Sequence, residues 1–132
     1  MEKKTKILVL IARILLGVIF VVFGANGLHP FLPMPPPPTG LAGQYVTTIF
    51  VSHYAVVPFT VQLAGGLLLL AGLYVPLGLA ILGPVIVNIL CFHIFLNHQG
   101  MGMAFFVTVL WFILFYHYRR SFAGIFERRP GT

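Results

Sequence analysis

Residues 77–96 read LGLAILGPVIVNILCFHIFL, a run of twenty residues without a lysine, arginine, aspartate or glutamate. About 20 apolar residues in helical form cross the roughly 30 Å hydrocarbon core of a bilayer. The run therefore predicts a membrane-spanning helix. Pro84 lies inside it and is expected to kink it, because proline removes one backbone hydrogen bond of the helix.

Three further apolar segments surround this run, at residues 7–28, 56–74 and 103–118. The chain is 59% hydrophobic and only 8% charged over its 132 residues, whereas soluble domains carry about a quarter charged residues. The tight turn at Tyr74, Val75 and Pro76 makes the second and third segments antiparallel neighbours. We therefore predict an all-α fold: a four-helix integral membrane bundle that forms a single domain over residues 1–132.

The distribution of charge predicts the orientation in the membrane. All eight lysines and arginines lie near the two ends: Lys3, Lys4, Lys6, Arg13, Arg119, Arg120, Arg128 and Arg129. Basic residues concentrate on the cytoplasmic side of membrane proteins, and an even number of crossings returns the chain to its starting side. We expect both termini, including a basic tail at residues 119–132, to be cytoplasmic, in an inner or plasma membrane. This placement argues against nucleic-acid binding despite the net charge of +6.

Residues near the inner edge support this orientation. Arg13 interrupts the first apolar segment at a depth from which a long side chain can reach the headgroup phosphates. At the end of the fourth segment, Trp111, Tyr116 and Tyr118 are amphipathic rings of the kind that concentrate at the membrane–water boundary.

The connection between the first two spans has two parts. Six prolines fall within residues 30–38, and since proline fixes its backbone dihedral and has no N–H donor, this stretch predicts a stiff extended strut. Residues 39–52 then predict a short amphipathic helix, too short to cross a bilayer. We expect this helix to lie in the interface or to cap the mouth of the bundle.

Polar side chains gather in the half of the predicted bundle that lies away from the termini. Such groups at membrane depth tend to face the bundle interior or a cavity. One interpretation is a pocket for a quinone headgroup or a lipid, with the candidate residues Asn26, Gln62, Asn88, His93 and Asn97. Another is that these groups only form hydrogen bonds between helices. Weaker candidates for haem or metal binding are His29, His53 and His93; the sequence requires no cofactor and holds no metal motif.

The residues that are missing narrow the function. The chain has no aspartate, and its only acidic residues, Glu2 and Glu127, lie outside the predicted spans. Proton-coupled pumps and cation channels usually need an intramembrane carboxylate. The single cysteine, Cys91, cannot form a disulfide within the chain. No nucleophile stands near a base at helical spacing, so we expect the protein not to be an independent enzyme.

The order of several short motifs resembles that of DoxX-type small membrane proteins. These motifs are ARILLG at residues 12–17, FGAN at 23–26, PMPP at 33–36, GGLLLL at 65–70, VPL at 75–77, PVIVNI at 84–89 and FHIFL at 92–96. The resemblance implies a four-helix membrane bundle associated with membrane redox systems, some of them quinone-linked. Proteins of this type often carry an acidic residue about four positions before the glycine of the second span, where this chain has Gln62.

Two hypotheses for the function follow. In the first, the protein is an accessory subunit of a quinone-linked membrane redox complex. In the second, it is a structural or assembly factor that binds other membrane proteins through small-residue helix faces, with the glycines Gly17, Gly24, Gly65 and Gly72. The bilayer is a partner in both, together with another membrane protein or a second copy of the chain.

Overall fold

A computed structural model describes residues 2–131, and every regular element within that range is helical. Four long helices are present, α1 (Lys3–Leu28), α3 (Val56–Ala71), α4 (Val75–Cys91) and α5 (Met101–His117). A shorter helix, α2 (Gly40–Val51), precedes α3. A π-helical turn, η1 (Phe92–Leu96), extends α4, and a 3₁₀ helix, η2 (Arg119–Phe126), follows α5. The predicted all-α class is confirmed.

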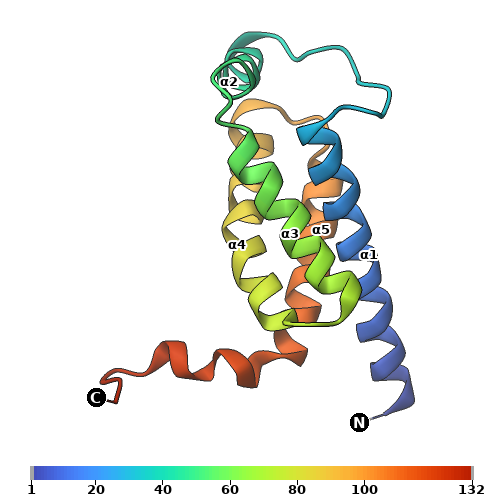
Figure 1. Ribbon diagram of the computed structural model, residues 1–132, viewed down its shortest axis with the longest axis vertical. Helices are drawn as coiled ribbons and strands as arrows, with labels where there is room; N and C mark the ends of the chain where they lie inside the picture. The colour runs from blue at the N-terminus through green and yellow to red at the C-terminus, as the bar shows by residue number, and fades with distance from the viewer. Residues whose placement is uncertain (1, 132) are drawn as a thin grey trace.

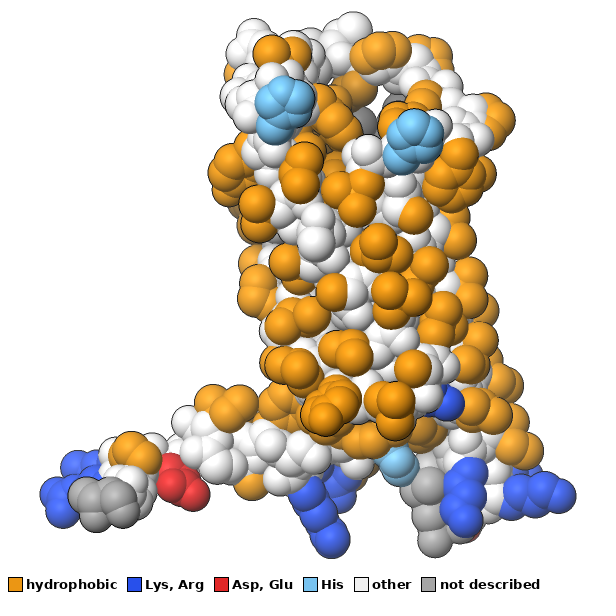
Figure 2. All heavy atoms as spheres, viewed as in Figure 1, with side chains coloured by type: hydrophobic (Ala, Val, Ile, Leu, Met, Phe, Trp, Pro, Cys, Tyr) orange, Lys and Arg blue, Asp and Glu red, His pale blue; other side chains and the backbone are white. Residues whose placement is uncertain are grey.

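The four long helices pack side by side (Figure 1). Around the group, α1 packs on α3, α3 on α4, α4 on α5 and α5 on α1. At one end lie α2 and the proline-rich connection, and at the other end lie both termini, with η2 pointing away from the helices (Figure 1). Lysine and arginine side chains lie toward the end that holds the termini, whereas histidines are visible at both ends (Figure 2).

Large apolar side chains and small residues together form the core. The largest fully buried side chains are Phe20, Leu16, Leu69, Leu79, Leu82 and Leu114. Glycine lets α1 and α3 approach closely: a Cβ atom on Gly24 would lie 2.7 Å from the backbone nitrogen of Leu63, and one on Gly17 would lie 3.1 Å from the carbonyl oxygen of Gly66. The small residues on one face of the first predicted span therefore form its contact with α3.

The predicted segments match the helices to within four residues at each end. The segments at 7–28, 56–74 and 103–118 correspond to α1, α3 and α5, and the segment at 77–96 corresponds to α4 with η1. The short helix expected at 39–52 is α2, and the proline-rich stretch before it is free of helix. The predicted tail contains the additional helix η2, whose Phe122 is buried against the core.

By length and composition, two helices are able to cross a membrane, Lys3–Leu28 and Val75–Leu96. The number rises to four if each of two bent helix pairs counts as one crossing: α2 with α3, bent by 84°, and α5 with η2, bent by 82°. Apolar side chains cover much of the outer surface between the two ends of the molecule (Figure 2). The helices are thus compatible with a location in a membrane.

Two side chains form hydrogen bonds that the sequence did not predict. Arg13 turns inward: its Nη1 donates to the carbonyl oxygens of Leu69, at 2.5 Å, and Leu70, at 3.5 Å. Trp111 also contacts a neighbouring helix. Its Nε1 donates to the carbonyl oxygen of Leu79 at 2.9 Å, and its ring stacks on Phe115. Both side chains satisfy backbone carbonyls of neighbouring helices, which local sequence patterns do not reveal.

Candidate functional site

Three of the five predicted pocket residues come together near the end of the molecule that carries α2. Gln62 comes from α3, Asn88 from α4 and His93 from η1, and all three line one hollow beneath α2 with a volume of about 190 Å³. A second hollow, of about 280 Å³, lies between α1, α3, α4 and α5. The two hollows share four lining residues: Phe59, Gln62, Ile89 and His93.

Gln62 is the most unusual of these side chains. It is only 7% exposed, and its amide forms no hydrogen bond with any group in residues 2–131. No polar side-chain atom of the described residues is both fully enclosed and without a partner, so the small exposed fraction of Gln62 includes its amide. A primary amide has two N–H donors and one carbonyl acceptor. The amide is therefore available to a molecule in the hollows.

His93 is held in a defined orientation by the turn that contains it. Its Nδ1 lies 3.0 Å from the backbone carbonyl oxygen of Asn97. A carbonyl oxygen can only accept, so Nδ1 carries the proton in this contact, and in the neutral ring Nε2 is a hydrogen-bond acceptor. The edge-to-face contact with Phe92 restricts the ring further. Single π-helical turns frequently occur at functional sites.

Asn88 closes the smaller hollow toward α2. Its Nδ2 donates to the hydroxyl oxygen of Tyr45 at 3.3 Å, and the ring of Tyr45 lies 5.5 Å from that of Phe92. Asn88 itself is exposed. These contacts attach α2 to the end of α4, so α2 covers the hollow. This position agrees with the second of the two placements expected for the short helix, a cap over the mouth of the bundle.

The two other predicted pocket residues are occupied elsewhere. The Oδ1 of Asn26 accepts from the backbone nitrogens of Phe31 and Leu32, both at 2.9 Å, so this side chain fixes the chain after α1. The Oδ1 of Asn97 accepts from the backbone nitrogen of Gln99 at 3.2 Å. Asn97 does not share a helix face with His93, although the two are four residues apart, because Asn97 follows the π-helical turn with extended backbone.

The haem and metal candidates do not gather. His29 follows α1 and His53 follows α2, and both are exposed. Neither lines the hollows that contain His93. Within residues 2–131 no group of three histidine, cysteine or acidic side chains is arranged to hold a metal ion.

The four predicted packing glycines serve contacts within the chain. Gly17 and Gly24 lie against α3, and a Cβ atom on Gly65 would meet the side chain of Leu82 in α4. Gly72 ends α3 with a φ of 69°, in the left-handed region that favours glycine, beside the guanidinium of Arg13. These faces are filled by the protein's own helices, so they offer no free surface to a partner helix in this arrangement.

Three residues of the site were missed in the sequence: Tyr45, Phe59 and Ile89. Phe59 and Ile89 separate the two hollows, and apolar residues in an apolar helix carry no signal for such a role. Tyr45 carried a weak signal, since a tyrosine on a short amphipathic helix presents a hydroxyl that needs a partner when buried. Only the packing of α2 on η1 identifies Asn88 as that partner.

The site is mainly apolar and contains a few polar, uncharged groups. Its walls are mainly aromatic and aliphatic, and no lysine, arginine, aspartate or glutamate lines either hollow. Gln62 supplies two donors and an acceptor, and His93 supplies an acceptor at Nε2. Such a surface fits a neutral ring that carries carbonyl or hydroxyl oxygens. No family model, curated protein or solved structure matches the chain.

Proposed function

We propose that the protein is an accessory subunit of a membrane redox complex and binds the headgroup of a quinone between α3, α4 and η1. One observation carries the proposal: the amide of Gln62, a residue only 7% exposed, has no protein partner, faces the hollows and lies beside His93. A quinone carbonyl would accept from this amide, and a quinol hydroxyl would donate to Nε2 of His93.

The size of the hollows supports a headgroup and not a whole ligand. Volumes of about 280 and 190 Å³ are smaller than the roughly 300–1,000 Å³ of pockets for drug-sized molecules. In this proposal the ring occupies a hollow and the apolar tail extends between the helices into lipid. The role in a redox complex is supported by the resemblance to DoxX-type proteins.

The proposal includes a membrane bundle with four crossings and with both termini in the cytoplasm. The helices α3 and α5 contain 16 and 17 residues, about 24 and 26 Å at 1.5 Å per residue, close to the lower limit for a crossing. The positive-inside rule supports the orientation. Labelling of Gly131→Cys in a Cys91→Ser background with a membrane-impermeant maleimide tests it: reaction from the extracytoplasmic side would contradict the topology.

The quinone proposal is tested with protein purified in mild detergent. A short-chain benzoquinone should raise the thermal unfolding temperature more than an alkylbenzene of the same chain length, which lacks the oxygens. Gln62→Leu should reduce quinone affinity about tenfold, the value of one hydrogen bond of roughly 1.4 kcal/mol. The control Gln44→Leu makes the same change at an exposed position of α2 and should bind normally.

Two results would overturn this proposal. One is equal stabilisation by the quinone and the alkylbenzene, which would show that the oxygens are not recognised. The other is equal quinone affinity in the two glutamine variants, which would remove Gln62 from the site.

A further inference from the structure

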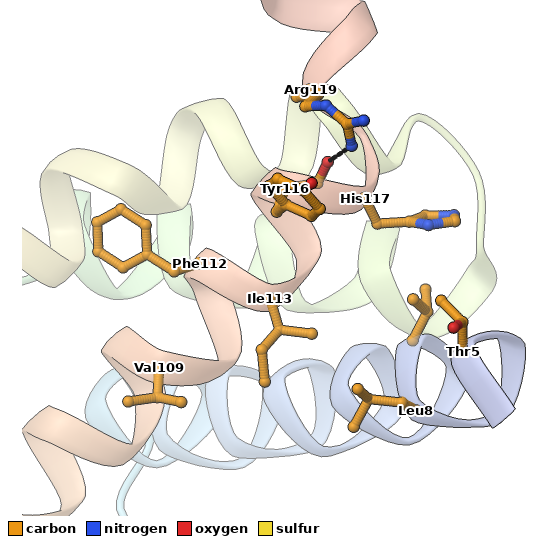
Figure 3. Close-up of a pocket in the computed structure, with 9 residues that line it drawn as sticks. Thr5, Leu8, Val109, Phe112, Ile113, Tyr116, His117 and Arg119 are labelled. Atoms are coloured by element: carbon orange, nitrogen blue, oxygen red, sulfur yellow. Dashed lines mark hydrogen bonds between the residues drawn. The ribbon is translucent and has the colours of Figure 1, made fainter.

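A larger groove lies at the opposite end of the molecule, between the start of α1 and the end of α5. Its volume is about 610 Å³. The lining residues are Thr5, Leu8, Val9, Val109, Phe112, Ile113, Tyr116, His117 and Arg119. Figure 3 shows Ile113 and Val109 of α5 on the side that faces Leu8 of α1, with Arg119 beyond Tyr116. The groove is separate from the hollows at Gln62.

The groove changes character along its length. The part formed by Leu8, Val109, Phe112 and Ile113 is apolar, and the part near the termini contains Arg119 with a histidine, a tyrosine and a threonine. From Val109 to Tyr116 the groove follows α5 over about 10 Å at 1.5 Å per residue. An apolar channel that ends at a cation matches a molecule with a long hydrocarbon chain and a negatively charged head.

Arg119 is positioned at this end by two contacts with one residue. Its guanidinium lies 4.2 Å from the ring centroid of Tyr116, and its Nη1 donates to the carbonyl oxygen of Tyr116 at 2.7 Å. A guanidinium has five N–H donors, so most of them remain for an anion. Arginine held in this way is well suited to phosphate, which it can bind through two parallel hydrogen bonds.

The electrostatic surroundings favour an anion. Seven of the eight basic residues belong to the segments that form this end, against the two carboxylates Glu2 and Glu127. The lysine and arginine side chains are gathered there in Figure 2. Each lysine or arginine near a membrane surface contributes about 1 kcal/mol to the attraction of anionic lipid. Free phosphate would use the cations alone and leave the apolar walls unexplained.

We propose that this groove binds an anionic phospholipid from the leaflet that contacts both termini. One acyl chain lies between α1 and α5 against Val109 and Phe112, and the phosphate accepts hydrogen bonds from Arg119. The proposal rests on the location of the protein in a membrane and is independent of quinone binding. It assigns the apolar groove and the basic termini to one ligand.

Native mass spectrometry of the protein in detergent tests this proposal, with phosphatidylglycerol and phosphatidylcholine of identical acyl chains as probes. Phosphatidylglycerol should bind at least fivefold more tightly. Arg119→Gln should reduce its affinity roughly fivefold to tenfold and should reduce phosphatidylcholine affinity less, because the choline cation already offsets the charge of the same phosphate. The matched control Arg128→Gln removes the same charge outside the groove and should change the affinity less than about twofold, because Arg128 makes no direct contact.

The apolar part of the groove is tested separately. Val109→Trp fills the groove and should reduce binding of both lipids. The control Leu67→Trp places the same ring on an exposed position of α3 that lines none of the hollows described here, and it should bind both lipids normally. Equal affinities for the two lipids, equal losses in Arg119→Gln and Arg128→Gln, or normal binding by Val109→Trp would each overturn the proposal. So would a dimer that dissociates in Val109→Trp, since the groove would then hold a second copy of the chain.

Discussion

Two polar side chains lie in the apolar surroundings of α3, one at its end and one close to its middle, and they differ in their hydrogen-bond partners. At the end of α3, Arg13 donates to the carbonyl oxygens of Leu69 and Leu70. Close to the middle of α3, Gln62 is 7% exposed and makes no hydrogen bond within residues 2–131. Both side chains lie among helices, but only the first has found protein partners.

This difference separates a structural role from a binding role. The last carbonyls of a helix have no partner within it, and they carry the partial negative charge of the helix dipole. Arg13 neutralises that charge and holds the end of α3 against α1. Gln62 contributes nothing comparable to the fold, since its donors and its acceptor face hollows. The comparison predicts that Arg13 is needed for stability and that Gln62 is needed for binding.

The largest expected effect is the loss of stability in Arg13→Met. This change keeps much of the length of the side chain and removes the charged donors. Hydrogen bonds to a charged group contribute about 1.5–3 kcal/mol, so we expect a loss of about 3 kcal/mol in the free energy of unfolding, measured by thermal or denaturant unfolding in mild detergent. The control Lys6→Met removes one charge from the exposed start of α1 and should have little effect. Equal stability of the two variants would show that the contacts of Arg13 do not support the fold.

The contact that connects the two regions is the close approach of α1 and α3. In Gly24→Ala the new Cβ atom would lie 2.7 Å from the nitrogen of Leu63 and 3.0 Å from the carbonyl oxygen of Phe59. Both are backbone atoms, so the helices must separate, and overpacking of this kind costs about 1–3 kcal/mol. We expect about 2 kcal/mol by the same unfolding measurement.

Gly102→Ala is the matched control for this change. It lies in α5 with nothing within 4 Å of its new Cβ atom, and alanine in place of helical glycine should stabilise the protein by less than about 1 kcal/mol. An unchanged free energy of unfolding in Gly24→Ala would show that the packing of α1 on α3 adjusts freely. The regions around Arg13 and Gln62 would then not be connected by a rigid contact between these two helices.

The fold could be predicted from the sequence to a large extent, because apolar segment length and proline placement act locally. The six prolines of residues 30–38 exclude helix wherever that segment lies, and the runs on either side are long enough to define the helices. The contacts of Arg13 could not be predicted. Leu69 is 56 positions away along the chain, and only the packing of α1 on α3 brings its carbonyl to the guanidinium.

The candidate site was predictable only in part. Gln62 and His93 were found because polar groups are rare in apolar helices. Asn97 was misplaced because a spacing of four residues from His93 implies one helix face, whereas the π-helical turn ends in extended backbone. The position of Asn26 shortly before a proline-rich stretch was an overlooked signal, since asparagine commonly binds the backbone of a following turn.

The smallest expected change in stability is also the one that best separates the two roles. In Gln62→Leu an apolar side chain of similar size replaces an amide that has no partner, so the ligand-free protein should lose no stability and should gain up to about 1 kcal/mol. Unfolding of the ligand-free variant and of the parent protein in the same detergent measures this difference. If Gln62 instead joins helices by hydrogen bonds, the variant should lose about 0.6 kcal/mol, the average for such bonds in a membrane protein. The sign of the change therefore distinguishes a residue kept for a ligand from one kept for the fold.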